Sequence, residues 1–279
     1  MASASDPWGK NVLVDFEDGI AWVRFNRPEK KNAMSPALNA EMRETVFKLA
    51  TDERCGVFVL TGQDDSFSAG MDLKEYFRET DDGPDTTLLN VRRTAEDWQW
   101  RRLRDYPKPT IAAVNGWCFG GAFTPLVGCD LAIAADEATF ALSEINWGIL
   151  PAGNVTKAVI ETMGYRDALY YTMTGESFDG KKAAELGLVN ESVPRANLED
   201  RTRELANILL SKNQAVLRNA KLAVKRVRYM DWEASADYLY AKMAEALHMG
   251  GAENRSNAMK AFLDDKEFKP GVQHFKGTK

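Results

Sequence analysis

The sequence predicts an α/β protein whose last third is helical. Short, β-rich apolar runs alternate with helical patterns over the first two thirds of the 279 residues. From residue 154 onward helical patterns dominate, with one interruption at 189–193. Such alternation is typical of a sheet with short crossover connections. We therefore expect a core at 1–200 and a helical segment at 201–279.

The first elements are a hairpin and a capped helix. Residues 12–16 and 20–25 are β-rich runs joined by a turn containing Gly19. A helix is predicted to begin at Ser35-Pro36, because Ser is a preferred N-cap and Pro fits the first helical position. Residues 56–60 form a continuous apolar run, which indicates a strand buried on both faces.

Two glycine-containing loops are predicted to lead into helices. Residues 63–72 are expected to be a loop before a short helix near 73–77, and residues 115–121 a turn opening a helix. Residues 79–87 have the composition of a mobile connection. Further strands are predicted at 110–114, 131–135 and 139–142.

Composition limits the partners and the compartment. The net charge is −5 with both signs interspersed, which argues against binding to nucleic acid. The three cysteines form no CxxC pair, which favours a reducing compartment. Residues 1–10 lack a signal-peptide core, and no apolar run approaches the ~20 residues of a membrane helix. We expect a cytoplasmic protein without a membrane partner.

Absent motifs limit the chemistry. There are only two histidines, His248 and His274, and no G-x-S-x-G, so a serine or cysteine nucleophile paired with histidine is disfavoured. The same count argues against a histidine-rich metal site, and we expect no metal. No Walker loop or G-x-G-x-x-G is present to hold nucleotide phosphates. Carboxylates, tyrosines and lysines remain for acid–base work.

Two strand-to-helix junctions are candidates for an oxyanion hole. Residues 67–72 and 115–121 each follow a predicted buried strand and contain glycine. Glycine lets the backbone approach a ligand closely, and the N–H groups at a helix start lack partners within the helix. Two such N–H groups converging on one oxygen would stabilise a developing negative charge. Two tight turns without a catalytic role are the alternative interpretation.

Glu144 is the candidate acid–base residue. It follows an apolar strand and is flanked by Leu142, Ile145 and Trp147. A carboxylate among apolar side chains is expected to have a raised pKa and to exchange a proton near neutrality. The alternative is a solvated loop glutamate whose neighbours do the packing.

Five motifs, in this order along nearly the whole chain, resemble the crotonase (enoyl-CoA hydratase/isomerase) superfamily. They are N-R-P-E-K-K-N-A, F-S-A-G-M-D-L, N-G-W-C-F-G-G-A, C-D-L-A-I-A and F-A-L-S-E-I-N-W-G. Within that superfamily, M-D-L-K-E-Y-F, N-G-W-C-F-G-G, S-E-I-N-W-G and D-Y-L-Y-A-K resemble the hydroxycinnamoyl-CoA (feruloyl-CoA) hydratase-lyases.

The resemblance implies a fold, an assembly and a substrate class. The expected fold is a spiral of ββα units with a helical C-terminal segment, in trimers or dimers of trimers. The expected substrate is a 4-hydroxycinnamoyl-CoA thioester, which is hydrated and then cleaved to an aromatic aldehyde and acetyl-CoA. No cofactor is implied, because coenzyme A is part of the substrate.

The resemblance also implies roles for individual residues. Glu144 would be the catalytic carboxylate, and the backbone N–H groups of Met71 and Gly121 would hold the thioester oxygen. Tyr76 and Tyr240 would bind the para-hydroxyl of the ring. The residues expected along the coenzyme A path are Lys30, Ala69, Leu73, Ser143 and Trp147.

The chain departs from the superfamily pattern after the glycine run. Thr124 stands where typical enoyl-CoA hydratases have a first catalytic glutamate, and Ala122 replaces a third glycine. Thr cannot exchange a proton at an accessible pKa, so a mechanism with two carboxylates is excluded. The hydratase-lyases share the lack of this carboxylate.

Several alternatives stay open. Tyr240 shares an apolar stripe with Ala236 and Met243, where an ordinary core tyrosine would also lie. The pair Trp98 and Trp100 is interpreted as packing. The main functional alternative is a hydratase or isomerase that acts on another acyl-CoA. A binding protein, for instance for RNA, is a second alternative that the acidic balance disfavours.

Overall fold

The computed structural model describes residues 8–81 and 83–267. The chain divides into two compact units, with residues 8–106 and 110–203 in the first and residues 107–109 and 204–267 in the second. The parts of the predicted core and helical segment at 1–7, 82 and 268–279, which include His274, lie outside the described residues.

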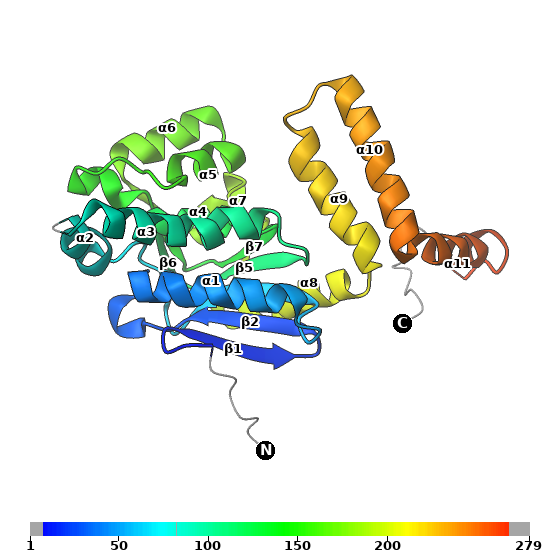
Figure 1. The fold of residues 1–279 in the computed structure, drawn as a ribbon, viewed down its shortest axis with the longest axis horizontal. Helices are drawn as coiled ribbons and strands as arrows, with labels where there is room; N and C mark the ends of the chain where they lie inside the picture. The colour runs from blue at the N-terminus through cyan, green and yellow to red at the C-terminus, as the bar shows by residue number, and fades with distance from the viewer. Residues whose placement is uncertain (1–7, 82, 268–279) are drawn as a thin grey trace, which may run out of the picture. The chain divides into compact units, whose positions relative to one another are not determined.

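The first unit contains a six-stranded sheet of order β1-β2-β3-β5-β7-β10 (Figure 1). Its strands are β1 (Val12–Glu17), β2 (Ile20–Phe25), β3 (Val57–Gly62), β5 (Thr110–Val114), β7 (Leu131–Ala135) and β10 (Glu191–Val193). β1 and β2 form the expected antiparallel hairpin, and the other neighbours are parallel. Every residue of β3 and β5 is buried, as their continuous apolar runs predicted.

A second sheet has the order β4-β6-β8-β9 and was not expected from the sequence. Its strands are β4 (Ser66–Ser68), β6 (Trp117–Phe119), β8 (Thr139–Ala141) and β9 (Ser177–Asp179). The predictions of a loop at 63–72, a turn at 115–121 and helix at 177–179 were therefore wrong at these strands. Three residues are too few to show a period of two, and pairing with neighbouring strands decides their conformation.

The two sheets are linked by a repeated ββα unit, as the resemblance implied. The chain passes three times from a strand of the first sheet to a strand of the second and then into a helix, through β3–β4, β5–β6 and β7–β8. Because β4, β6 and β8 are parallel neighbours, the loops that follow them leave the same edge of the sheet. This topology brings three distant sequence segments together.

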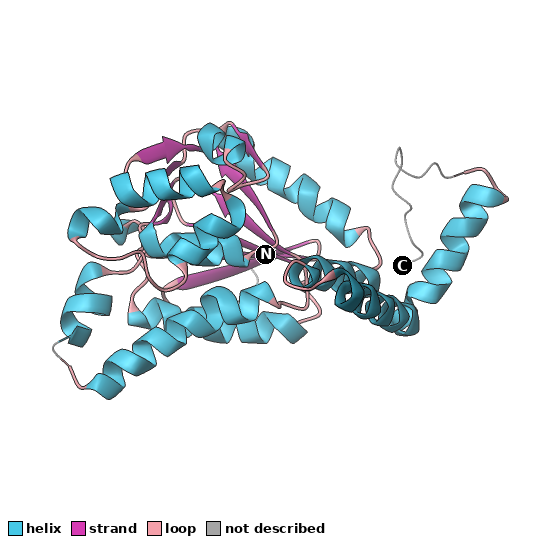
Figure 2. Cartoon of the chain, turned by 90° about the horizontal axis from the view of Figure 1, so that it is seen from above, coloured by secondary structure: helices cyan, strands magenta, loops and turns pink. Residues whose placement is uncertain are grey.

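Helices lie on either side of the first unit's strands (Figure 2). Those before β5 are η1 (Pro28–Lys30), α1 (Pro36–Thr51), η2 (Leu73–Arg78), α2 (Glu79–Asp81), α3 (Asp85–Glu96) and η3 (Asp97–Arg102). Those after β6 are η4 (Gly120–Ala122), α4 (Phe123–Gly128), η5 (Ser143–Trp147), α5 (Val155–Thr162), α6 (Tyr165–Thr174), α7 (Gly180–Glu185), η6 (Arg195–Asn197) and α8 (Leu198–Leu210).

Local sequence explains the start of two of these helices. Ser35 caps α1 as predicted, since its hydroxyl accepts a hydrogen bond from the backbone N–H of Leu38. Residues 79–87 were predicted as a mobile connection, but they contain α2 and the start of α3. Pro84 precedes α3, and Asp85 places a negative charge in its first turn, where the helix dipole favours it.

The second unit is helical. It contains the end of α8, then α9 (Gln214–Val227), α10 (Trp232–Ala246), η7 (Leu247–Gly251) and α11 (Ala252–Leu263), and Figure 1 shows α9 and α10 side by side. Asn213 and Asp231 cap α9 and α10 through their side-chain oxygens. No helix in the described part of the chain is both long and apolar enough to cross a membrane.

Candidate active site

A cavity of about 960 Å³ lies where the loops after β4, β6 and β8 meet. It brings together nine of the ten residues that the sequence analysis singled out for the site. These are Lys30, Ala69, Met71, Leu73, Tyr76, Gly121, Ser143, Glu144 and Trp147. The tenth, Tyr240, lies on α10 in the second unit with 70% of its surface exposed. The role of Tyr240 therefore stays a prediction.

The backbone around Met71 leaves one N–H group unused. Met34 and Met71 form an isolated parallel bridge in which Met34 donates to the Gly70 carbonyl at 2.7 Å and accepts from Asp72 at 3.1 Å. In this parallel bridge Met34 bonds the residues on either side of Met71 and not Met71 itself. The N–H of Met71 therefore points away from Met34. It has no hydrogen-bond partner among the described residues, and Met71 lines the cavity.

Gly121 brings a second N–H group beside the first. It lies in η4, a single turn whose first N–H groups have no partner within the helix. A Cβ on Gly121 would lie 3.5 Å from the Met71 nitrogen, and a Cβ on Gly70 would lie 3.2 Å from the Gly121 nitrogen. Gly70 has φ +89, a conformation that glycine adopts without strain. The two donors are therefore adjacent, which is the arrangement that an oxyanion hole requires.

Glu144 faces the same junction from η5. A Cβ on Gly120 would lie 3.0 Å from Oε1 of Glu144, so the carboxylate lies directly against the backbone of the glycine run. Oε2 is buried and has no hydrogen-bond partner among the described residues. Burial raises the pKa of the Glu144 carboxyl above its ordinary value. A raised pKa makes this carboxylate a better proton acceptor, as general acid–base catalysis requires.

The other carboxylates of the cavity lining are engaged elsewhere. Asp72 pairs with Arg27 at 3.0 Å and accepts bonds from the backbone at the start of η2. Glu96 lies 3.6 Å from Arg101. Glu144 is thus the lining carboxylate that is free for proton transfer among the described residues.

Thr124 uses its hydroxyl in a structural bond. The side chain is only 3% exposed, and its Oγ1 donates to the Gly153 carbonyl at 2.9 Å. Gly153, which has φ +59, lines the cavity. Where a second carboxylate would stand in a typical hydratase, this chain therefore has a bond that holds the cavity wall.

A buried ion pair fixes the turn that carries Leu73 and Tyr76. Arg27 donates to Asp72 at 3.0 Å, to Glu75 at 2.6 Å and to the Ala33 carbonyl at 2.7 Å. Burial alone would raise the pKa of Asp72, but the backbone N–H of Glu75 and the Arg27 guanidinium together hold that pKa below its ordinary value. The charged form of Asp72 is therefore stabilised as the cap of η2.

Tyr76 lines the cavity from η2. It is 8% exposed, and burial raises the pKa of its hydroxyl, which therefore stays protonated. A protonated phenol can donate to an oxygen of a bound aromatic ring or accept from its hydroxyl.

The sequence analysis missed one wall of the cavity. It is a face of α3 and η3 made of Arg92, Ala95, Glu96 and Gln99. Their spacing of i, i+3, i+4 and i+7 marks one helical face and could have been noticed. Trp98, which lies beside this face, is a core residue with 0% exposure, and this confirms its interpretation as packing.

The residues predicted along the coenzyme A path form an exposed part of the cavity lining. Leu73 is 45% and Trp147 is 64% exposed, and Lys30 ends η1 at the surface. Trp117 and Phe119, which we did not predict, also line the cavity and stack their rings 4.9 Å apart. An amphipathic ligand with an anionic end suits such a lining.

The chain matches a family model and is similar to several known proteins. The enoyl-CoA hydratase/isomerase family model matches residues 15–272. A hydroxycinnamoyl-CoA hydratase-lyase of Pseudomonas fluorescens is 57% identical over 276 residues, covering 99% of this chain and all of the relative. A 4-chlorobenzoyl coenzyme A dehalogenase of Arthrobacter is 34% identical over 212 residues, covering 75% of this chain and 74% of the relative.

Solved structures agree on the fold. An enoyl-CoA hydratase from Bacillus anthracis has a TM-score of 0.82 at 26% identity, covering 91% of this chain and 96% of that one. One from Mycobacterium smegmatis has a TM-score of 0.81 at 28% identity, with the same two coverages. From the family match, the relatives and the site together, we conclude that this chain belongs to the enoyl-CoA hydratase/isomerase family.

Proposed function

We propose that this enzyme is a hydroxycinnamoyl-CoA hydratase-lyase. It hydrates the double bond of a 4-hydroxycinnamoyl-CoA thioester and then cleaves the product to an aromatic aldehyde and acetyl-CoA. The observation that carries this proposal is a single unpaired carboxylate, Glu144, beside two adjacent N–H donors, with Thr124 in place of a second carboxylate. The relative that is 57% identical bears the same activity in its name.

Hydration uses Glu144 twice. Its carboxylate takes a proton from water, and the hydroxide adds to the β-carbon of the thioester. The electron pair of the double bond moves to the thioester oxygen, which accepts hydrogen bonds from the N–H groups of Met71 and Gly121. The protonated Glu144 then returns its proton to the α-carbon, which completes the β-hydroxy thioester and restores the carboxylate.

Cleavage repeats the same proton cycle. Glu144 takes the proton of the β-hydroxyl, the Cα–Cβ bond breaks, and the aldehyde leaves. The bonding pair passes to the acetyl thioester, whose enolate oxygen occupies the same pair of N–H donors. Protonation of the enolate carbon by Glu144 yields acetyl-CoA. One carboxylate suffices because each step returns the proton that the previous one removed.

The substrate's two ends are assigned to different parts of the cavity. The ring hydroxyl binds Tyr76, whose own hydroxyl stays protonated, and Tyr240 is assigned to the same hydroxyl. Lys30, Ala69, Leu73, Ser143 and Trp147 line the coenzyme A path, with Lys30 near phosphate and Ala69 at the adenine. We assign no cofactor beyond the coenzyme A of the substrate.

We also propose a trimer or a dimer of trimers in the cytoplasm. Large apolar side chains on the surface of the first unit support contacts between copies. Two of them that lie outside the cavity lining, Tyr165 and Met173, are 67% and 70% exposed. Sedimentation of the purified protein at several concentrations tests the assembly, and a monomer throughout would contradict it.

The deciding experiment is incubation with feruloyl-CoA. We expect vanillin and acetyl-CoA in equal amounts, and Glu144→Gln under the same conditions should form neither above background. The alternative function, a hydratase or isomerase acting on another acyl-CoA, predicts a stable hydroxy thioester or an unchanged substrate. Either of those results would overturn the lyase assignment.

A further inference from the structure

Gln99 is a buried polar residue for which the proposed reaction has no use. It lies in η3, is 2% exposed and lines the cavity. Its Nε2 lies 3.5 Å from the Met34 sulfur, 4.0 Å from the Met71 sulfur and 3.3 Å from Oδ1 of Asn39. A buried amide needs partners, and two of the partners here are thioether sulfurs, which are weak acceptors.

The two methionines touched by Gln99 belong to the backbone that carries the first oxyanion donor. Met34 is bonded to the residues on either side of Met71, through the Gly70 carbonyl and the Asp72 N–H. The amide of Gln99 therefore contacts both segments of this parallel bridge, through Met34 and Met71. Through these side chains it connects η3 to the loop that contains Gly70 and Met71.

The Met71 side chain also lies against the second donor. A Cβ on Gly121 would lie 3.1 Å from Cγ and 3.5 Å from Cε of Met71, so the thioether chain packs over the Gly121 backbone. This side chain thus contacts Gln99 at its sulfur and Gly121 at the carbons on either side of the sulfur. A change in its position would move the two N–H donors relative to each other.

Side-chain support is needed here because methionine and glycine alone do not fix the geometry. The bond from Met34 holds the Gly70–Met71 peptide at its carbonyl, but the Met71 side chain that packs over Gly121 has three rotatable bonds of its own. An oxyanion hole is effective only when its donors are held at the position that the oxygen will occupy.

We propose that Gln99 is a positioning residue that holds the Met71 thioether over Gly121 and so keeps the N–H groups of Met71 and Gly121 at the spacing that one thioester oxygen requires. The proposal rests on the proposed function, because both readouts use feruloyl-CoA, but the spectroscopic readout requires only that this thioester binds and not that it is turned over. Gln99 touches neither reacting atom in this role and acts through Met71.

The test compares Gln99→Leu, Met71→Leu and the double variant. Each single change removes one side of the amide–sulfur contact and keeps apolar bulk. We expect kcat with feruloyl-CoA to fall about tenfold for Gln99→Leu with little change in KM, because full loss of one donor is worth about 10²–10³-fold. If Gln99 acts through Met71, the double variant should be no slower than the slower single variant.

A second readout reports the hydrogen bonds directly. Feruloyl-CoA bound to Glu144→Gln should absorb at longer wavelength than in water, because hydrogen bonds to the thioester oxygen polarise the conjugated acyl group. Adding Gln99→Leu should reduce this shift. The matched control is Arg102→Gln on the same helix η3, which removes the 2.7 Å bond from Arg102 to Asp97 without touching Gln99, Asn39 or Met71 and should leave the shift unchanged.

The outcomes separate the two proposals. An unchanged wavelength shift in Gln99→Leu, an additive double variant, or an equal effect in Arg102→Gln would overturn the positioning role. Absence of aldehyde from the wild type would overturn the lyase assignment, while the wavelength shift would still decide the role of Gln99. If Gln99→Leu does not fold, Met71→Leu must by itself reduce both the shift and kcat, and a full shift in that variant would overturn the role.

Discussion

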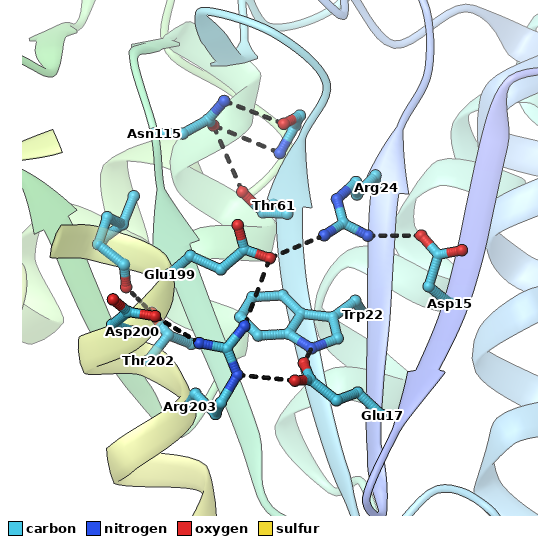
Figure 3. Close-up of polar contacts among 12 residues, drawn as sticks. Asp15, Glu17, Trp22, Arg24, Thr61, Asn115, Glu199, Asp200, Thr202 and Arg203 are labelled. Atoms are coloured by element: carbon cyan, nitrogen blue, oxygen red, sulfur yellow. Dashed lines mark hydrogen bonds and ion pairs between the residues drawn. The ribbon is translucent and has the colours of Figure 1, made fainter. Parts of the chain in front are cut away.

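Charged side chains are paired with one another in one region of the first unit, whereas a carboxylate lacks a partner in another. Where β1, β2 and the start of α8 meet, Arg203 pairs with Glu17 at 2.9 Å and with Asp200 at 2.6 Å, and Arg24 pairs with Asp15 at 2.6 Å (Figure 3). Glu199 contacts both arginines. In the cavity, by contrast, Oε2 of Glu144 is buried without a partner.

This contrast separates groups that serve the fold from groups that serve the reaction. The carboxylates of the ion pairs in Figure 3 are 40–80% exposed. Exposed ion pairs add little stability, because water screens the attraction between the charges. A buried carboxylate without a partner is unfavourable for folding. Its presence beside two unpaired N–H groups indicates that this part of the structure is arranged for a ligand that supplies the missing partners.

The largest effect is expected from Glu144→Gln. The amide keeps the shape but cannot take a proton, so kcat should fall by about 10²–10⁴-fold, the range of general acid–base catalysis. Binding of the substrate, measured by its absorbance shift, should persist. Near-wild-type turnover would show that the unpaired carboxylate is not the acid–base group.

A large loss of stability is expected from Arg27→Met, because it leaves a buried carboxylate next to the cavity without its cation. Asp72 would remain buried at 8% side-chain exposure without its cation. Removing one partner of a buried pair costs about 3–5 kcal/mol, so urea unfolding at neutral pH should detect it easily. The loss should shrink in acid, where Asp72 becomes protonated. Glu75→Gln is the control, because Glu75 is 38% exposed and should cost less than about 1 kcal/mol.

A smaller effect on folding and a visible effect on rate are expected from Gly120→Ala. Gly120 has φ +51, which costs a residue with a Cβ about 1–2 kcal/mol. The added Cβ would also lie 3.0 Å from Oε1 of Glu144 and displace the carboxylate. We expect a loss of about 1–2 kcal/mol in chemical unfolding and a lower kcat. Full activity would show that the position of Glu144 is not set by this contact.

The pH dependence of the free energy of unfolding tests the raised pKa of Glu144. Burial raises its pKa, so between the ordinary and the raised value the folded protein keeps a proton that the unfolded chain has released. In that window the free energy of unfolding falls as pH rises, by up to about 1.4 kcal/mol per pH unit. Glu144→Gln removes this fall. Its stability relative to wild type should therefore increase as the pH rises above the ordinary glutamate pKa, and a constant difference would contradict the raised pKa.

The catalytic segments were predictable because their chemistry is local. The glycines after β4 and β6 and the glutamate after β8 each stand at a strand end, and parallel neighbouring strands bring such ends together. Nine predicted residues thus line one cavity. Of the strands that align them, β8 was predicted at 139–142, whereas β4 and β6 were missed, because three residues carry no period of their own and pair only in the folded chain.

The remaining gaps have similar physical causes. The wall made by Arg92, Glu96 and Gln99 mixes charged and polar residues, so hydrophobic periodicity does not mark it. The contact between Gln99 and Met71 joins residues far apart in sequence, through a sulfur that no motif marks as an acceptor. The role of Tyr240 stays a prediction, because the pattern within α10 does not specify what this side chain contacts.

The smallest effect is expected from Arg203→Gln, which breaks the network of Figure 3 at its centre. Arg203 is 32% exposed, and its partners Glu17, Glu199 and Asp200 are 40%, 59% and 80% exposed. Water can solvate these carboxylates once the guanidinium is gone, so the loss should stay below about 1 kcal/mol and decrease further in salt. kcat and KM should equal those of the wild type. A large loss of stability, or any loss of turnover, would mean that this surface is coupled to the cavity and that the two regions are not independent.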